Sequence, residues 1–173
     1  ALEGRKVFRT LVSIEDALSE LHKYFKPEPA STNDVPVADS MGRTIAEDVV
    51  AQIDVPGFDR AAMDGYAVIA EDTFGAGNFN PVRLMLSEVI HAGDTARGEV
   101  TSGTCIQVAT GSPIPAGADA VVQVEDTELD GDPARTGTVK IYKPVYPRQN
   151  VSPQGEDIQP GREVLPSGTR LDP

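Results

Sequence analysis

Apolar residues near the beginning of the chain recur every three or four positions, which is the spacing of one face of an α-helix. Ser13 precedes this run and Asp16 follows three residues later, so the two can form a capping box at the start of the helix. Pro27 would end the helix. The pattern predicts an amphipathic helix over residues 13–25, with an apolar face made of Ile14, Ala17, Leu18, Leu21 and Phe25.

Beyond this helix the apolar residues fall in short runs or alternate with polar residues, as they do in β-strands. Clusters of Gly, Pro and Asp separate these runs at hairpin-like intervals, and no helix-length periodic segment interrupts them. The sequence therefore predicts a mainly β, mostly antiparallel barrel-like or sandwich module with one N-terminal α-helix. The expected strands cover residues 35–37, 44–53, 66–70, 81–90, 105–109, 120–124 and 138–142.

Residues 54–68 concentrate charge between two expected strands, in the string Asp-Val-Pro-Gly-Phe-Asp-Arg-Ala-Ala-Met-Asp-Gly-Tyr-Ala-Val. The charged residues are Asp54, Asp59, Arg60 and Asp64. Phe58 and Met63 can anchor the segment, and a pinned loop that presents polar groups is well placed for chemistry. Asp64-Gly65 is typical of a turn in which the glycine adopts a positive φ. The same pair is also common in the turns of β-hairpins, so spacing alone leaves a purely structural role open.

Residues 110–119, Thr-Gly-Ser-Pro-Ile-Pro-Ala-Gly-Ala-Asp, form a second candidate site segment. Its prolines remove backbone donors and its glycines allow tight bends, so a rigid connection between two strands explains the pattern without a function. In a functional interpretation, the Thr110 hydroxyl and nearby backbone N–H groups could hold an oxyanion.

The chain is acidic, with 27 Asp and Glu against 15 Lys and Arg and a formal net charge of −12. This balance argues against a nucleic-acid-binding protein, which needs a basic face. No apolar run is long enough for a membrane span, and the N-terminus lacks the apolar segment of a signal peptide. Cys105 is the single cysteine and lies in an expected strand, which favours a buried inert thiol and is compatible with a reducing cytoplasm.

Four segments together resemble one family. The string Pro-Gly-Phe-Asp-Arg-Ala-Ala-Met-Asp-Gly-Tyr-Ala at 56–67 closely resembles the signature of the molybdopterin molybdenumtransferases, the MoeA family, whose eukaryotic relative is the E domain of gephyrin. Segments at 41–49, 109–122 and 155–158 follow in the family's order. The resemblance implies that the parent enzyme inserts molybdate or tungstate into adenylylated molybdopterin and releases AMP with the help of Mg²⁺. The sequence does not choose between the two metals.

The resemblance also implies residue roles and partners. Asp64 and Thr110 match family residues close to the active-site cleft and are the expected catalytic residues, with Asp64 also linked to the metal. Asp59, Arg60 and Gly111 are the expected cofactor-binding residues. A cytoplasmic homodimer is expected, acting with the molybdopterin-adenylylating protein of the same pathway and with neither nucleic acid nor membrane as a partner.

The chain departs from the family in the segment before Gly155. Family members often carry several arginines there, whereas this chain has Asn-Val-Ser-Pro-Gln at 150–154 and Arg148 as its nearby guanidinium. We therefore expect no phosphate-binding role for residues 150–154. Relatives also continue past the segment that matches residues 168–171 into a pterin-binding domain. The isolated chain is accordingly expected to be an N-terminal region that folds but is catalytically inactive.

Three parts are expected within the chain. The N-terminal helix occupies residues 1–27, residues 28–50 and 147–173 form a smaller discontinuous β-rich domain, and residues 51–146 form a β barrel-like domain inserted between its halves. A hypothesis from another functional class remains open, in which the chain is a non-enzymatic scaffold module whose strand edges bind a protein partner.

Overall fold

The computed structural model describes residues 12–26, 28, 31–91, 93–132 and 136–172. They divide into two compact units, one from the described parts of Ala1–Ala46 and Arg170–Pro173, the other spanning Glu47–Thr169. The fold is mainly β with one α-helix, which confirms the predicted fold class. The expected division into 1–27, 28–50 with 147–173, and 51–146 stays a prediction.

The first unit contains the predicted helix, α1 (Ile14–Tyr24). Ser13 caps it as expected, because its Oγ accepts the Asp16 N–H at 3.0 Å and donates to the Asp16 carboxylate at 2.9 Å. None of the α1 residues is buried, so its apolar face is exposed. The expected strand at 35–37 is wrong, since Val37 begins a short 3-10 helix, η1 (Val37–Asp39). Among the described residues, no helix could cross a membrane.

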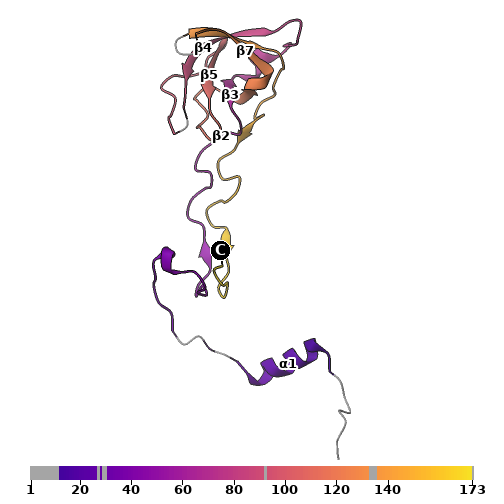
Figure 1. Cartoon of the computed structure of the whole chain (residues 1–173), viewed down its shortest axis with the longest axis vertical. Helices are drawn as coiled ribbons and strands as arrows, with labels where there is room; N and C mark the ends of the chain where they lie inside the picture. Colours follow the sequence, from indigo (N-terminus) through magenta and orange to yellow (C-terminus); the bar gives the residue numbers. More distant parts are fainter. Residues whose placement is uncertain (1–11, 27, 29–30, 92, 133–135, 173) are drawn as a thin grey trace, which may run out of the picture. The chain divides into compact units, whose positions relative to one another are not determined.

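The second unit is built on a curled six-stranded sheet, drawn in the upper part of Figure 1. The strand order is β6-β3-β5-β4-β8-β7. All neighbouring pairs are antiparallel except β4 and β5, which are parallel. The bounds are β3 (Gly65–Val68), β4 (Val82–Val89), β5 (Thr104–Val108), β6 (Ala120–Gln123), β7 (Thr127–Asp132) and β8 (Thr136–Ile141).

Five of these strands lie where the alternation of apolar residues predicts them. The apolar pattern does not predict the edge strand β7, because Leu129 is its only large apolar residue and the others are threonine, glycine or acidic. Its place comes from a six-residue antiparallel pairing with β8. An edge strand of this composition needs pairing on one side only, so it has little hydrophobic signal of its own.

Side chains on the two faces of the sheet enter two core clusters. Along β3, Tyr66 and Val68 join the first cluster and Ala67 joins the second, as expected from the two-residue period of a strand. The first cluster gathers side chains between β3, β4, β5, β6 and β8, including Cys105, which is fully buried as predicted. The second cluster is completed by residues outside the six-stranded sheet, among them Ala61, Ile114 and Val151. The candidate site lies in the segments that carry these residues.

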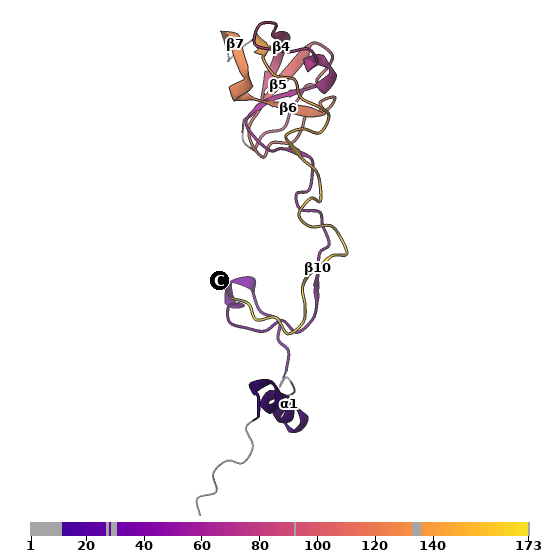
Figure 2. The ribbon, with the colours of Figure 1, turned by 90° about the vertical axis from the view of Figure 1, so that its right-hand side faces the viewer.

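Two paired segments lead away from the sheet within the second unit, and Figures 1 and 2 both show them running side by side. Here β1 (Val49–Val50) pairs with β10 (Glu163–Leu165), and an isolated bridge joins Val55 to Ile158. Only two residues of the strand expected at 44–53 are therefore in a ladder. Residues more than a hundred positions apart are neighbours along these segments, a relation that no local pattern could predict.

Candidate functional site

The signature segment, residues 56–67, lies between two other segments of the chain. We call these three segments the three-segment layer. On one edge, β2 (Arg60–Ala61) pairs antiparallel with β9 (Val151–Ser152). On the other edge, the segment 110–114 donates Gly111 N–H to the Ala61 carbonyl at 2.8 Å and Ile114 N–H to the Asp59 carbonyl at 3.0 Å. The Ala61 N–H completes this edge by donating to the carbonyl of Ser112 at 2.9 Å. Backbone hydrogen bonds on both sides hold the signature segment in place.

The layer is also fastened to the β6 edge of the sheet. Val121 N–H donates to the Gln149 carbonyl at 3.1 Å, and the Asn150 side-chain amide donates to the Val121 carbonyl at 2.8 Å. The Asn150 carbonyl in turn accepts the Ala62 N–H at 2.9 Å. Residues 149–150 thus bridge β6 and the signature segment.

Asp64 and Thr110 meet in this layer. Asp64 Oδ1 accepts hydrogen bonds from both the backbone N–H and the hydroxyl of Thr110, each at 2.7 Å. The Thr110 N–H, followed by its hydroxyl, lowers the pKa of the exposed Asp64 carboxyl below its ordinary value, so the group is ionised at neutral pH. The two residues predicted to be catalytic, 46 positions apart, therefore form one exposed polar pair.

Two glycines beside this pair have different roles. Gly111 has φ +84°, so the turn after Thr110 uses a conformation that favours glycine. The positive φ expected at Gly65 is wrong, because Gly65 is the first residue of β3 and is not among the positive-φ residues. Its requirement is space, since a Cβ atom there would lie 2.0 Å from the Val122 carbonyl oxygen.

Asp59 has both carboxylate oxygens engaged by groups of the chain itself. Oδ2 accepts from Arg148 Nη1 at 2.5 Å, and Oδ1 accepts from the Gln154 N–H at 2.7 Å. The Arg148 hydrogen bond, with the Gln154 N–H second, lowers the pKa of this carboxyl. Its predicted role in cofactor binding stays a prediction, and its observed contacts are structural.

Arg60 is held more loosely. Its Nε lies 3.4 Å from Ser152 Oγ, and its Nη2 lies 3.7 Å from a carboxylate oxygen of Asp157. About two fifths of the side chain is exposed, at 40%. The guanidinium therefore keeps donors that face solvent, consistent with either a ligand-binding or a structural role.

Asp64 is the residue that the family resemblance links to a metal, and this role stays a prediction. Among the described residues, no group of three or more His, Cys, Asp or Glu side chains could enclose a metal ion. Oδ2 of Asp64 has no hydrogen-bond partner in the described part of the chain, while Oδ1 is fixed by Thr110. A magnesium ion held by one carboxylate, with phosphate and water oxygens as its other ligands, fits this arrangement.

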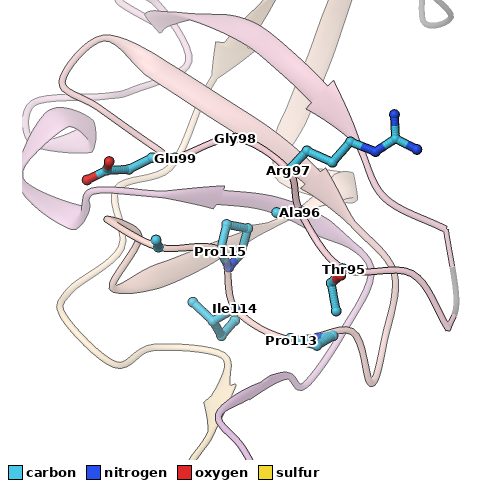
Figure 3. Close-up of a pocket in the computed structure, with 9 residues that line it drawn as sticks. Thr95, Ala96, Arg97, Gly98, Glu99, Pro113, Ile114 and Pro115 are labelled. Atoms are coloured by element: carbon cyan, nitrogen blue, oxygen red, sulfur yellow. The ribbon is translucent and has the colours of Figure 1, made fainter.

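A cavity of about 400 Å³ lies beside the layer, between residues 95–99 and 113–116. Figure 3 shows Pro113, Ile114 and Pro115 along one side and the side chains of Arg97 and Glu99 directed away from the space between the loops. The Glu88 carboxylate holds the facing loop by accepting the N–H groups of Arg97 and Gly98. This cavity does not include Asp64 or Thr110 among its lining residues.

Comparison with known proteins identifies the family. The family described as "MoeA N-terminal region (domain I and II)" matches residues 12–173. The chain belongs to the MoeA family. It is 35% identical over 165 residues to the molybdopterin molybdenumtransferase of Bacillus subtilis, covering 95% of this chain and 38% of that protein. It is 40% identical over 139 residues to molybdopterin molybdenumtransferase 2 of Mycobacterium tuberculosis, covering 80% of this chain and 33% of that protein.

A solved structure agrees with the fold of this MoeA-family chain. The crystal structure of the molybdopterin biosynthesis MoeA protein from Pyrococcus horikoshii OT3 superposes with a TM-score of 0.83 at 43% sequence identity. The match covers 95% of this chain and 42% of that one. The chain therefore spans about two fifths of the length of the relatives it matches.

Arg148 and Gln154 are neighbours of the signature segment that the sequence pattern does not reveal. The sequence assigns no role to either residue. Their partner Asp59 lies 89 and 95 positions away, respectively. The one local signal was the concentration of carboxylates in residues 54–64, which indicates that some of them need donors from elsewhere.

Proposed function

We propose that this chain is the N-terminal region of a molybdopterin molybdenumtransferase. The parent enzyme would insert molybdate or tungstate into adenylylated molybdopterin and release AMP. The observation that carries the proposal is the exposed Asp64–Thr110 pair, formed by two segments that match the family. The names of the relatives support the same reaction class, since those proteins are called molybdopterin molybdenumtransferases.

In this proposal Asp64 is an orienting carboxylate and Thr110 positions it. The two hydrogen bonds from Thr110 keep Oδ1 in one place and favour the ionised carboxylate, so a ligand can approach Oδ2 of a negatively charged group. The reaction needs positioning and charge neutralisation more than a protein nucleophile. The buried Cys105 thiol is unsuited to nucleophilic attack, because burial raises its pKa to about 12.

A magnesium ion would be held by Asp64 in the bound state. It would supply Lewis-acid stabilisation of phosphate oxygens. Asp59, Arg60 and Gly111 stay candidates for cofactor contact. Among these, Arg60 has the most weakly engaged side chain and is our choice for binding an anionic group.

The test is molybdenum-cofactor formation by the full-length parent carrying Asp64→Asn, which removes the charge at nearly constant shape. We expect activity to fall by at least about a hundredfold, the scale of losing one preorganised electrostatic group. Asp72→Asn is the matched control, because Asp72 likewise accepts one hydroxyl and one backbone N–H, from Ser102 at 3.0 Å and Gly103 at 2.8 Å. Activity of Asp64→Asn within about twofold of wild type would remove Asp64 from the mechanism and favour the scaffold hypothesis.

The proposal includes an incomplete site in the isolated chain. The parent would act as a cytoplasmic homodimer, with protein outside this chain completing the cleft and a molybdopterin-adenylylating protein supplying the substrate. Calorimetry of the 173-residue chain with Mg²⁺ and AMP should detect no tight binding. A micromolar dissociation constant, equivalent to about −8 kcal/mol, would show that these residues form a complete site.

A further inference from the structure

We propose that Asp59 and Arg148 form a clamp that positions the signature segment and, through it, the Asp64–Thr110 pair. In this role both are positioning residues, which act through Asp64 and Thr110. The inference rests on the proposed function only where it predicts activity, since the clamp itself is a property of this chain.

Asp59 connects three distant parts of the chain. Its carboxylate accepts from Arg148 Nη1 at 2.5 Å and from the Gln154 N–H at 2.7 Å, while its carbonyl accepts the Ile114 N–H at 3.0 Å. A charged acceptor bound to a guanidinium and a backbone N–H makes stronger hydrogen bonds than a neutral one. Asp59 is therefore the point at which the flanking segments 110–114 and 148–154 are both joined to the signature segment.

The backbone of Arg148 is held in a conformation that its side chain does not favour. Its φ is +69°, in the left-handed region where a residue with a Cβ atom is uncommon. Its N–H donates to the Asp119 carbonyl at 2.8 Å, its carbonyl accepts the Val151 N–H at 3.3 Å, and its guanidinium donates to Asp59. A glycine would suit this backbone better. The arginine side chain is accordingly explained by its bond to Asp59.

The clamp is connected to Asp64 through the neighbouring segment 110–114. The Ile114 N–H donates to the Asp59 carbonyl, and Ser112 and Gly111 exchange hydrogen bonds with Ala61. The residue before Gly111, Thr110, donates to Asp64. If the bond between Asp59 and Arg148 is lost, Asp59 is held less firmly. The segment 110–114 is then less well aligned at Ile114, which donates to the Asp59 carbonyl. The Thr110 N–H and hydroxyl would then meet Asp64 less often. The fold of the sheet would remain, because its buried core does not include the clamp.

The test uses two substitutions and a control in the 173-residue chain. Asp59→Asn removes the charge, and Arg148→Gly removes the guanidinium while relieving the left-handed backbone. Lys143→Ala is the control, because it removes an exposed ion pair with Asp126 of 3.3 Å elsewhere in the unit. Amide hydrogen exchange measured by NMR reports local opening at each hydrogen bond.

We expect both clamp variants to speed exchange at Thr110, Gly111 and Ile114 by about fivefold, the scale of one partly exposed charged pair. Exchange in β3 and β5 should stay unchanged, as should all amides in Lys143→Ala. A role in overall stability alone would instead raise exchange at the most protected sheet amides together with the loop. That uniform result, or unchanged exchange at Thr110 and Gly111, would overturn the clamp.

Activity of the full-length parent separates this inference from the proposed function. Asp59→Asn should lower kcat by about tenfold with KM within about twofold, since misplacement of a catalytic group reduces transition-state stabilisation more than ground-state binding. Arg148→Lys should keep a higher kcat than Arg148→Gly, because lysine keeps the positive charge although it lacks the planar guanidinium. If Asp64→Asn is fully active, the proposed function fails while the exchange result still decides the clamp. If Asp64→Asn is inactive and exchange at Thr110 is unaffected by Asp59→Asn, only the clamp fails.

Discussion

The six-stranded sheet and the three-segment layer around Asp64 are both made of short β segments, but different forces hold them. All four residues of β3 are buried, and its neighbours supply apolar side chains on both faces. The layer contains β2 and β9, each two residues long, and is joined by backbone hydrogen bonds and the Asp59–Arg148 pair. The sheet depends mainly on buried area. The layer contributes Ala61, Ile114 and Val151 to the second cluster and depends in addition on the identity of single donors and acceptors.

This difference means that the two regions should respond to different changes. Removing volume from the sheet should reduce the free energy of unfolding of the whole unit. Removing one charge from the layer should leave the unit folded and alter the site locally, because partly exposed ion pairs contribute little to global stability. A layer of this kind can change its charged residues at low cost to the fold that carries it.

The largest expected effect concerns the reactivity of Cys105 in the sheet. The thiol is fully buried, and burial raises its pKa from 9.0 to about 12. At pH 8 the thiolate population falls about a thousandfold, so alkylation of the native chain should be slower than that of the urea-unfolded chain by at least this factor. Iodoacetamide labelling followed by mass spectrometry measures both rates. A native rate within about tenfold of the unfolded rate would show that β5 opens locally and would break the contrast with the layer.

Ile106→Ala should be the most damaging of the stability substitutions. Ile106 is fully buried in the second cluster, and the cavity left by its side chain should lower the free energy of unfolding by about 2–5 kcal/mol. Urea denaturation followed by circular dichroism gives this value. Met85→Ala in β4 is the matched control, since Met85 is 57% exposed and should change stability by less than about 0.5 kcal/mol.

Gly65→Ala probes the junction of the two regions, because Gly65 follows Asp64 and begins β3. The added Cβ would lie 2.0 Å from the Val122 carbonyl oxygen, so β3 and β6 must separate. We expect a loss of about 1–3 kcal/mol in the free energy of unfolding, together with changed NMR signals at Thr110. Gly57→Ala is the control, since no atom lies within 4 Å of its added Cβ. Equal stabilities of the two variants would contradict the close approach of β3 to β6.

The smallest expected effect is the pH dependence contributed by Asp59. Its folded-state pKa is lowered from 3.8, chiefly by Arg148, so its stabilising contribution is present above the unfolded pKa and is lost as pH falls through the lower folded pKa. Asp59→Asn should reduce the free energy of unfolding by less than about 1 kcal/mol at pH 7, given the exposure of the pair. It should also make the fall in stability between about pH 5 and pH 2 less steep. Parallel pH profiles of the variant and the wild type would contradict this assignment.

Local patterns in the sequence are enough to predict those parts of the protein in which each residue's environment follows from periodicity. The spacing of apolar residues places α1 and five of the six sheet strands, because a helix face or a buried strand needs apolar side chains at a fixed period. It also indicates a buried Cys105. The signature residues themselves carry the family resemblance, since they need no structural context to be compared.

Tertiary structure decided which distant groups meet. Asp59 bonds to Arg148, 89 positions away, and Asp64 bonds to Thr110, 46 positions away. No local period in the sequence predicts either pair. The requirement for glycine at position 65 is a further example. Local turn chemistry suggests that a special backbone conformation requires it, whereas the structure shows that the nearby carbonyl of Val122 leaves no space for a Cβ atom. The physical reason is the same in each case. Hydrogen bonds and steric contacts depend on atoms that come within a few ångströms only after the buried sheet has brought the chain segments together.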